Sequence, residues 1–200
     1  MSTTRLLILG AVRIFQPVHG YFVRKELVSW EVDCWAHLNP GSVYNALQKL
    51  SRDGLLVEST TDASALGAAR TTTYSLTNEG DQEFLSLLRA ALGTVDEYAA
   101  DSLMAGVAFM WALPREEVKA ALVGRLDQLT VLEENSAQIL EHKCLDPETP
   151  DHVQEIQRLV FARLRGEKDW TGELIDRIGG DAYAFAGEPT EGHFPRDPRC

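Results

Sequence analysis

Apolar and polar positions separate most sharply in residues 39–56. When these residues are turned through about 100° each, as in an α-helix, the apolar ones gather on one side: Val43, Ala46, Leu47 and Leu50. The other side carries polar side chains: Ser42, Tyr44, Asn45, Gln48, Lys49 and Arg52. Asn39 can cap such a helix, Pro40 suits its first position, and Gly54 suits the left-handed residue that closes it. The pattern predicts an amphipathic helix with one side that packs and one side that suits base edges and phosphates.

The flanking residues predict the rest of a winged helix-turn-helix domain over residues 1–92. Apolar spacing, caps and β-branched alternation predict helices at about 5–15, 20–30 and 77–92, and strands at 55–60 and 71–76. Small and flexible residues between the two strands predict the long tip of a hairpin, which is the wing. Arg70, at the base of the wing, either contacts phosphate or the minor groove or is a solvated loop arginine.

Residues 93–180 predict a helical dimerisation and effector domain. Apolar residues at steps of four and three predict helices at about 95–113, 114–142 and 150–178, the last two forming an antiparallel pair. Two helices leave much of their apolar stripe uncovered, so either a partner subunit or the winged domain covers it. Residues 181–200 predict a flexible tail. The predicted fold class is mainly α with a small β-hairpin: a winged helix-turn-helix domain plus a long-helix dimerisation domain.

The acidic charge of the chain is concentrated outside the predicted DNA-binding domain. The formal net charge is −11, but residues 1–92 hold 8 Lys and Arg against 9 Asp and Glu, whereas residues 93–200 hold 11 against 21. An acidic rear region would repel DNA and help to orient docking. The net charge by itself neither establishes nor excludes DNA binding.

The remaining composition argues against a metal site, a membrane span and an enzyme. Cys34, Cys144 and Cys200 are an odd number without a Cys-x-x-Cys pair, which fits a reducing cytoplasm. Cys34 and His37 have ligand-like spacing but lack further partners, so we expect no metal. The apolar run from Leu6 is too short to span a bilayer and makes a poor signal peptide. No nucleophile elbow, metal set or phosphate loop is present, so we expect no catalytic residues and no cofactor.

Four residues are candidates for binding a small aromatic or hydrophobic effector: Trp35, Phe109, Met110 and Trp111. Their aromatic rings and thioether are typical of the lining of ligand cavities, and we place such a cavity between the winged domain and the long helices. Ordinary core packing is the alternative for each of them.

The motifs resemble those of the PadR family of bacterial transcriptional regulators. The matching segments, in order, are Leu6-Leu7-Ile8-Leu9-Gly10, Val18-His19-Gly20-Tyr21, Pro40-Gly41-Ser42-Val43-Tyr44 with Ala46-Leu47, Leu50, Gly54-Leu55, and Tyr74-Ser75-Leu76-Thr77-Asn78-Glu79-Gly80. The long helical region behind them is similar to the larger carboxy-terminal domain of one PadR subfamily. The resemblance implies a winged helix-turn-helix dimer that represses nearby genes, is released by a small molecule and turns Tyr44 toward the DNA backbone. Asn45 replaces a proline of many relatives and Ser51 a frequent glutamate, so the operator of those relatives does not transfer.

Together these observations predict a cytoplasmic, dimeric, ligand-responsive repressor that binds a near-palindromic double-stranded operator. Asn45 and Gln48 have the amide geometry that reads adenine in the major groove. Phosphate contacts are assigned to Ser42, Tyr44, Lys49 and Arg52, with Arg70 serving the wing. The alternative is a winged-helix protein-interaction module without sequence-specific DNA binding, in which the acidic half engages a basic partner.

Overall fold

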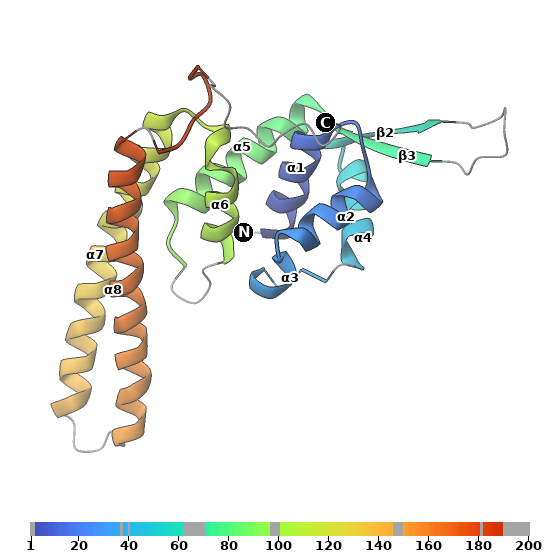
Figure 1. The fold of residues 1–200 in the computed structure, drawn as a ribbon. Helices are drawn as coiled ribbons and strands as arrows, with labels where there is room; N and C mark the ends of the chain where they lie inside the picture. The colour runs from blue at the N-terminus through green and yellow to red at the C-terminus, as the bar shows by residue number, and fades with distance from the viewer. Residues whose placement is uncertain are drawn as a thin grey trace. The chain divides into compact units, whose positions relative to one another are not determined.

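The computed structural model describes residues 3–36, 38–39, 41–61, 71–96, 101–145, 150–180 and 182–189. Helices dominate these residues, and one three-stranded antiparallel sheet accompanies them (Figure 1). The predicted fold class, mainly α with a small β-hairpin, is confirmed. The chain divides into two compact units, Met1–Ala91 with Asp101–Phe109, and Leu92–Ala100 with Met110–Cys200. The predicted boundaries at residues 92, 180 and 200 stay predictions.

The first unit is built around helix α1. Its helices are α1 (Thr3–Phe15), α2 (Gly20–Ser29), α3 (Val32–Trp35), α4 (Ser42–Arg52), most of α5 (Asn78–Gly93), and α6 (Asp101–Phe109). The apolar run Leu6–Leu9 of α1 is fully buried, which explains why it is apolar on every side. At Gly10 the ring of Phe109 comes so close that a Cβ would lie 2.3 Å from its Cζ atom. Only glycine allows α6 to pack this closely on α1.

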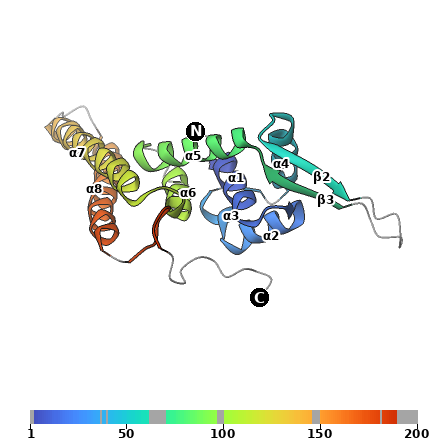
Figure 2. The ribbon, with the colours of Figure 1, turned by 90° about the horizontal axis from the view of Figure 1, so that it is seen from above.

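The sheet contains the predicted hairpin and one strand that the sequence did not predict. Strands β2 (Leu56–Thr61) and β3 (Thr71–Leu76) pair from Leu56 opposite Leu76 to Thr61 opposite Thr71. They run side by side away from the helices of their unit (Figure 2). The two-residue strand β1 (Val18–His19) pairs with the other edge of β3, and the Nδ1 atom of His19 lies 3.1 Å from the carbonyl oxygen of Thr72. This contact fits a structural rather than a chemical role for His19.

The second unit is dominated by two long antiparallel helices, α7 (Arg115–Leu145) and α8 (Asp151–Gly179), preceded by the short 3₁₀ helix η1 (Met110–Ala112) (Figure 1). Their facing apolar stripes are buried against each other at Val118, Leu122 and Leu129 of α7 and at Leu164, Leu174 and Ile178 of α8. In the described part of the chain, no helix is both long and apolar enough to cross a membrane.

One buried arginine organises the second unit. Arg125 of α7 is 1% exposed, and its Nε atom donates to the Oε1 atom of Glu167 on α8 at 3.0 Å. Its Nη1 atom donates to the carbonyl oxygen of Thr94 at 2.6 Å, just past the end of α5. Residues 94–96 are not helical, and the Arg125 side chain supplies a partner for the Thr94 carbonyl there. The helix predicted at 95–113 is therefore only partly observed: α6 ends at Phe109, and the 3₁₀ turn η1 follows.

Candidate nucleic-acid interface

Helix α4 begins at Ser42, later than the predicted cap at Asn39 implies, and its N-cap Gly41 makes no side-chain cap hydrogen bond. The side-chain oxygen of Asn39 accepts a hydrogen bond from the backbone N–H of Gly41 at 2.9 Å, and Ser42 Oγ donates to the carbonyl oxygen of Asn39 at 2.7 Å. At the other end Gly54 has φ +75°, and the N–H of Leu55 donates to the carbonyl oxygen of Leu50. Asn39 therefore stabilises a turn ahead of the helix and not the predicted cap, whereas Gly54 closes the helix as predicted.

The two sides of α4 differ in burial as the hydrophobic pattern predicts. Val43, Leu47 and Leu50 are at most 3% exposed and anchor the helix in the core of its unit. The exposed residues of the helix are Tyr44, Asn45, Gln48, Lys49 and Arg52. Asn45 and Gln48 thus lie outside the hydrophobic interior, which is the position that base reading requires.

The aromatic residue of this polar side packs against the beginning of α2. Tyr44 is 42% exposed, and a Cβ on Gly20 would lie 3.2 Å from its Cε1 atom. Its ring therefore packs against the backbone of Gly20 at the beginning of α2. Arg52 is turned back along its own helix, with Nε donating to the carbonyl oxygen of Gln48 at 3.3 Å. Ser42 is half-buried and uses its hydroxyl at the helix start.

The wing is anchored at its base by Tyr74. This residue of β3 is 8% exposed and lies opposite Glu58 of β2. Burial raises the pKa of the Tyr74 hydroxyl above its usual value, and the negative charge of Glu58 adds to the effect. Tyr74 is therefore neutral at physiological pH and acts as a packed anchor. Arg70, the residue assigned to the wing, lies outside the described residues.

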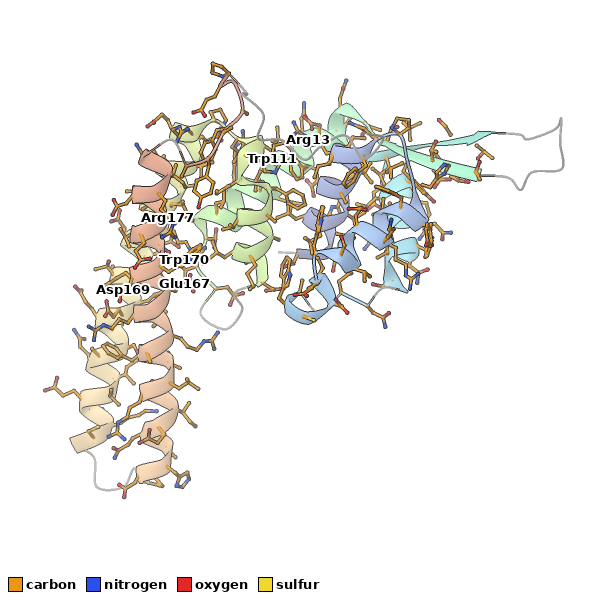
Figure 3. The ribbon with its side chains drawn as sticks, in the orientation of Figure 1. Arg13, Trp111, Glu167, Asp169, Trp170 and Arg177 are labelled. Carbon is orange, nitrogen blue, oxygen red and sulfur yellow. The ribbon has the colours of Figure 1, made fainter. Side chains whose placement is uncertain are left out.

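The structure distributes the four candidate effector residues between the two units. Phe109 is 1% exposed and makes edge-to-face contacts with Phe84 and Trp30, with ring centroids 5.6 and 6.0 Å apart. Trp35 is half-buried, and its indole N–H donates to the carbonyl oxygen of Trp30 at 3.1 Å. Met110 is 7% exposed, and Trp111, labelled in Figure 3, is half-buried in the second unit. The contacts of Phe109 are those of a core residue, and the effector site stays a prediction.

Metal-binding residues do not gather in the described part of the chain. No group of three His, Cys, Asp or Glu side chains that could hold an ion occurs there. Cys34 is exposed, and its candidate partner His37 lies outside the described residues.

The structure also places a residue beside α4 that the sequence analysis did not consider. Arg5, in the first turn of α1, lines a groove together with Asn45 and Lys49 of α4. About 40 residues separate these positions along the chain, and only the packing of α1 on α4 brings them together. Sequence periodicity shows which side of a helix is buried but not which neighbour borders its exposed side.

Helices packed around α1, a two-stranded wing and a helix with an exposed polar side are the features of the winged helix-turn-helix class of DNA-binding proteins. Residues 8–86 match the Transcriptional regulator PadR-like family. Over these residues, which make up less than half of the 200-residue chain, the sequence is similar to a family of transcriptional regulators. The resemblance inferred from the motifs is thereby confirmed.

Several solved structures are similar to the chain at low sequence identity. Bacillus subtilis PadR in complex with operator DNA is 20% identical, with 87% of this chain and 98% of that chain covered and a TM-score of 0.40. For Bacillus subtilis PadR in complex with p-coumaric acid the values are 17%, 89%, 98% and 0.37. For a PadR-like transcriptional regulator from Bacillus cereus they are 17%, 87%, 94% and 0.37. Among curated proteins, none matches the chain. The likeness to the family therefore rests on the sequence match over residues 8–86.

Proposed function

We propose that the protein is a homodimeric repressor that binds a near-palindromic operator through α4 and leaves it when a small molecule binds. The observation that carries this proposal is the division of α4 into a buried apolar stripe and an exposed side with two amides and two cations. A helix whose exposed side carries amides and cations suits double-stranded DNA, because amides bind adenine edges and cations bind phosphates.

Each exposed residue of α4 has a role in this proposal. Asn45 and Gln48 read bases, and Lys49 and Arg52 hold phosphates, with Ser42 and Tyr44 as further phosphate contacts. Arg52 must leave its 3.3 Å contact with the Gln48 carbonyl to reach a phosphate, which is a small cost for a long exposed side chain. Arg70 is assigned to the wing from the sequence alone.

Exposed apolar residues of the helical pair support the dimer. Ile139 of α7 and Ile156 of α8, 47% and 58% exposed, lie within two turns of the connection between the helices. Val131 and Leu159 are exposed to 56% and 62%. Large apolar side chains grouped on one helical pair are typical of a surface that another protein chain covers. A two-fold dimer presents two copies of α4, and this predicts half-sites about 10 bp apart.

Effector release is the third element of the proposal. A ligand dissociates the complex only if it prefers a state in which the two α4 helices no longer match the half-site spacing. Trp35, Phe109, Met110 and Trp111 remain the candidate contacts. Tryptophan fluorescence measured across a panel of aromatic compounds tests them; an unchanged spectrum for every compound would remove this site.

The direct test is a footprint of the purified protein on the DNA upstream of its own gene, repeated with candidate inducers. We expect protection of a near-palindrome, with a shift to higher protein concentration when an inducer is present. Retardation that is equal for this DNA and for random DNA would instead favour the protein-interaction module.

A further inference from the structure

A groove borders the polar side of α4. It has a volume of about 440 Å³ and is lined by Thr4, Arg5, Ser42, Asn45, Ala46, Lys49 and Leu50. The five residues from α4 follow one another at steps of three, one, three and one, so they form a single stripe along the helix. At 1.5 Å per residue, this stripe is about 12 Å long. The opposite wall is the amino-terminal turn of α1.

The groove is continuous with the proposed reading surface, because Asn45 and Lys49 belong to both. A duplex that brings base edges to Asn45 therefore brings its flanking backbone to the groove. The chemistry of the lining matches such a backbone: two cations stand on opposite walls, Arg5 on α1 and Lys49 on α4, and the amide of Asn45 also lines the α4 wall. Groups of this kind bind phosphate oxygens.

The guanidinium group of Arg5 is oriented by two acids but keeps unused donors. Its Nε atom lies 3.0 Å from Glu83 Oε1, and its Nη1 atom lies 3.5 Å from Asp53 Oδ2. The Nε atom is nevertheless buried without an aligned hydrogen bond, so the contact with Glu83 is an ion pair of poor geometry. Within the described residues, Nη2 of Arg5 makes no hydrogen bond. All three side chains are about one-third exposed, so these pairs hold Arg5 in place only weakly.

We propose that this groove seats a backbone phosphate of the operator, with Arg5 supplying a DNA contact from α1 opposite Lys49. The proposal rests on the proposed function and adds a helix outside the helix-turn-helix to the contact surface. Glu83 and Asp53 orient Arg5 and at the same time offset its charge. Removing one of these acids is therefore expected to strengthen DNA binding.

The experiment measures operator affinity against salt concentration for the full chain and four variants. Log affinity falls as log salt rises, and Arg5→Gln should make this dependence less steep by about 0.9, the value for one lost phosphate contact. With this difference in slope, the affinity of wild type relative to Arg5→Gln should be about eightfold higher at 0.1 M salt than at 1 M salt. Arg5→Lys keeps the charge and should keep the slope. Glu83→Gln should raise the affinity.

Arg13→Gln is the matched control. Arg13 lies on the same helix, is 28% exposed against 29% for Arg5, and pairs with Asp81 at 2.7 Å (Figure 3). It does not line the groove. We expect its variant to bind with the slope of the wild-type chain. Thermal unfolding of every variant separates a loss of contact from a loss of folded protein.

A second measurement locates the contact. Replacing single operator phosphates by neutral methylphosphonates should identify one position that weakens the wild-type chain more than it weakens Arg5→Gln, which keeps only the Lys49 side of the groove. An unchanged slope for Arg5→Gln, or no gain for Glu83→Gln, would overturn the groove proposal while leaving the proposed function intact. Failure of the wild-type chain to prefer its operator would instead overturn the proposed function.

Discussion

Helix α4 and the pair α7–α8 are both amphipathic, but they leave different surfaces exposed. The apolar stripe of α4 is buried within its own unit, and what remains outside is amide, hydroxyl and cation. The pair α7–α8 buries its facing stripes yet leaves Val131, Ile139, Ile156 and Leu159 exposed. The exposed polar side of α4 suits binding to a polyanion, and the exposed apolar residues of α7–α8 suit binding to another protein chain. The difference suggests that the two units recognise different partners, and the following changes test it.

The largest effect is expected for Arg125→Ala in the helical pair. The change leaves Glu167 of α8, labelled in Figure 3, without its buried partner and the carbonyl oxygen of Thr94 without its donor. We expect a loss of about 3 kcal/mol in the free energy of unfolding, measured by urea denaturation. Arg177→Ala, which breaks an exposed pair with Glu173 on the same unit, is the control and should cost about 0.5 kcal/mol or less. Equal losses would contradict the role given to the buried pair.

Gly10→Ala tests the core behind α4. The added Cβ would lie 2.3 to 2.7 Å from three atoms of the buried Phe109 ring. Overpacking should destabilise the first unit by about 1–3 kcal/mol, despite the better helix propensity of alanine. Gly166→Ala in α8 meets no atom within 4 Å and should be stabilising. Thermal unfolding of the two variants should therefore shift in opposite directions.

Leu159→Gln tests whether another protein chain covers the exposed apolar residues of the helical pair. The side chain is 62% exposed, so its replacement should leave the free energy of unfolding of the monomer within about 0.5 kcal/mol of the wild-type value. If a second copy covers it, the dimer should weaken by about 1–2 kcal/mol in sedimentation equilibrium. An unchanged dimer for both Leu159→Gln and Ile156→Gln would place the dimer interface elsewhere.

The smallest effect concerns the residues after α8. Arg115 donates to both carboxylate oxygens of Glu188, at 2.6 and 2.9 Å, and this lowers the pKa of Glu188 below its usual value. A carboxyl with a lowered folded-state pKa stabilises above its unfolded pKa, and this contribution is lost as the pH falls through the folded value. Glu188→Gln should therefore be less stable than wild type at neutral pH, with the difference vanishing in acid. A difference that persists at low pH would show that the ion pair is not its cause.

Sequence periodicity predicted α4, the hairpin and the long helices because each has a strong local pattern. The sides of α4 followed directly from its residues, since burial of Val43, Leu47 and Leu50 determines which residues stay exposed. Contacts over long sequence distances were not predictable in this way. Strand β1 is only two residues long, and its pairing with β3 joins positions more than 50 residues apart.

Two further contacts depended on partners that no local pattern identifies. We predicted a flexible tail from residue 181, but Phe185 is 1% exposed and Glu188 pairs with Arg115. The prolines and glycines of this segment do not indicate that the Phe185 ring packs against the guanidinium group of Arg115, whose Cζ atom lies 4.8 Å from the ring centroid. Arg5 was likewise read only as part of a helix, because its neighbours Asn45 and Lys49 lie on another helix.

The central claim, that the polar side of α4 reads DNA, is tested most directly by comparing Gln48→Ala and Lys49→Ala on the footprinted operator and on random DNA. Loss of a base contact should cost Gln48→Ala about 1–3 kcal/mol on the operator and nothing on random DNA. Loss of a phosphate contact should weaken Lys49→Ala on both DNAs alike. Equal losses of Gln48→Ala on both DNAs, or no loss on either, would contradict the claim.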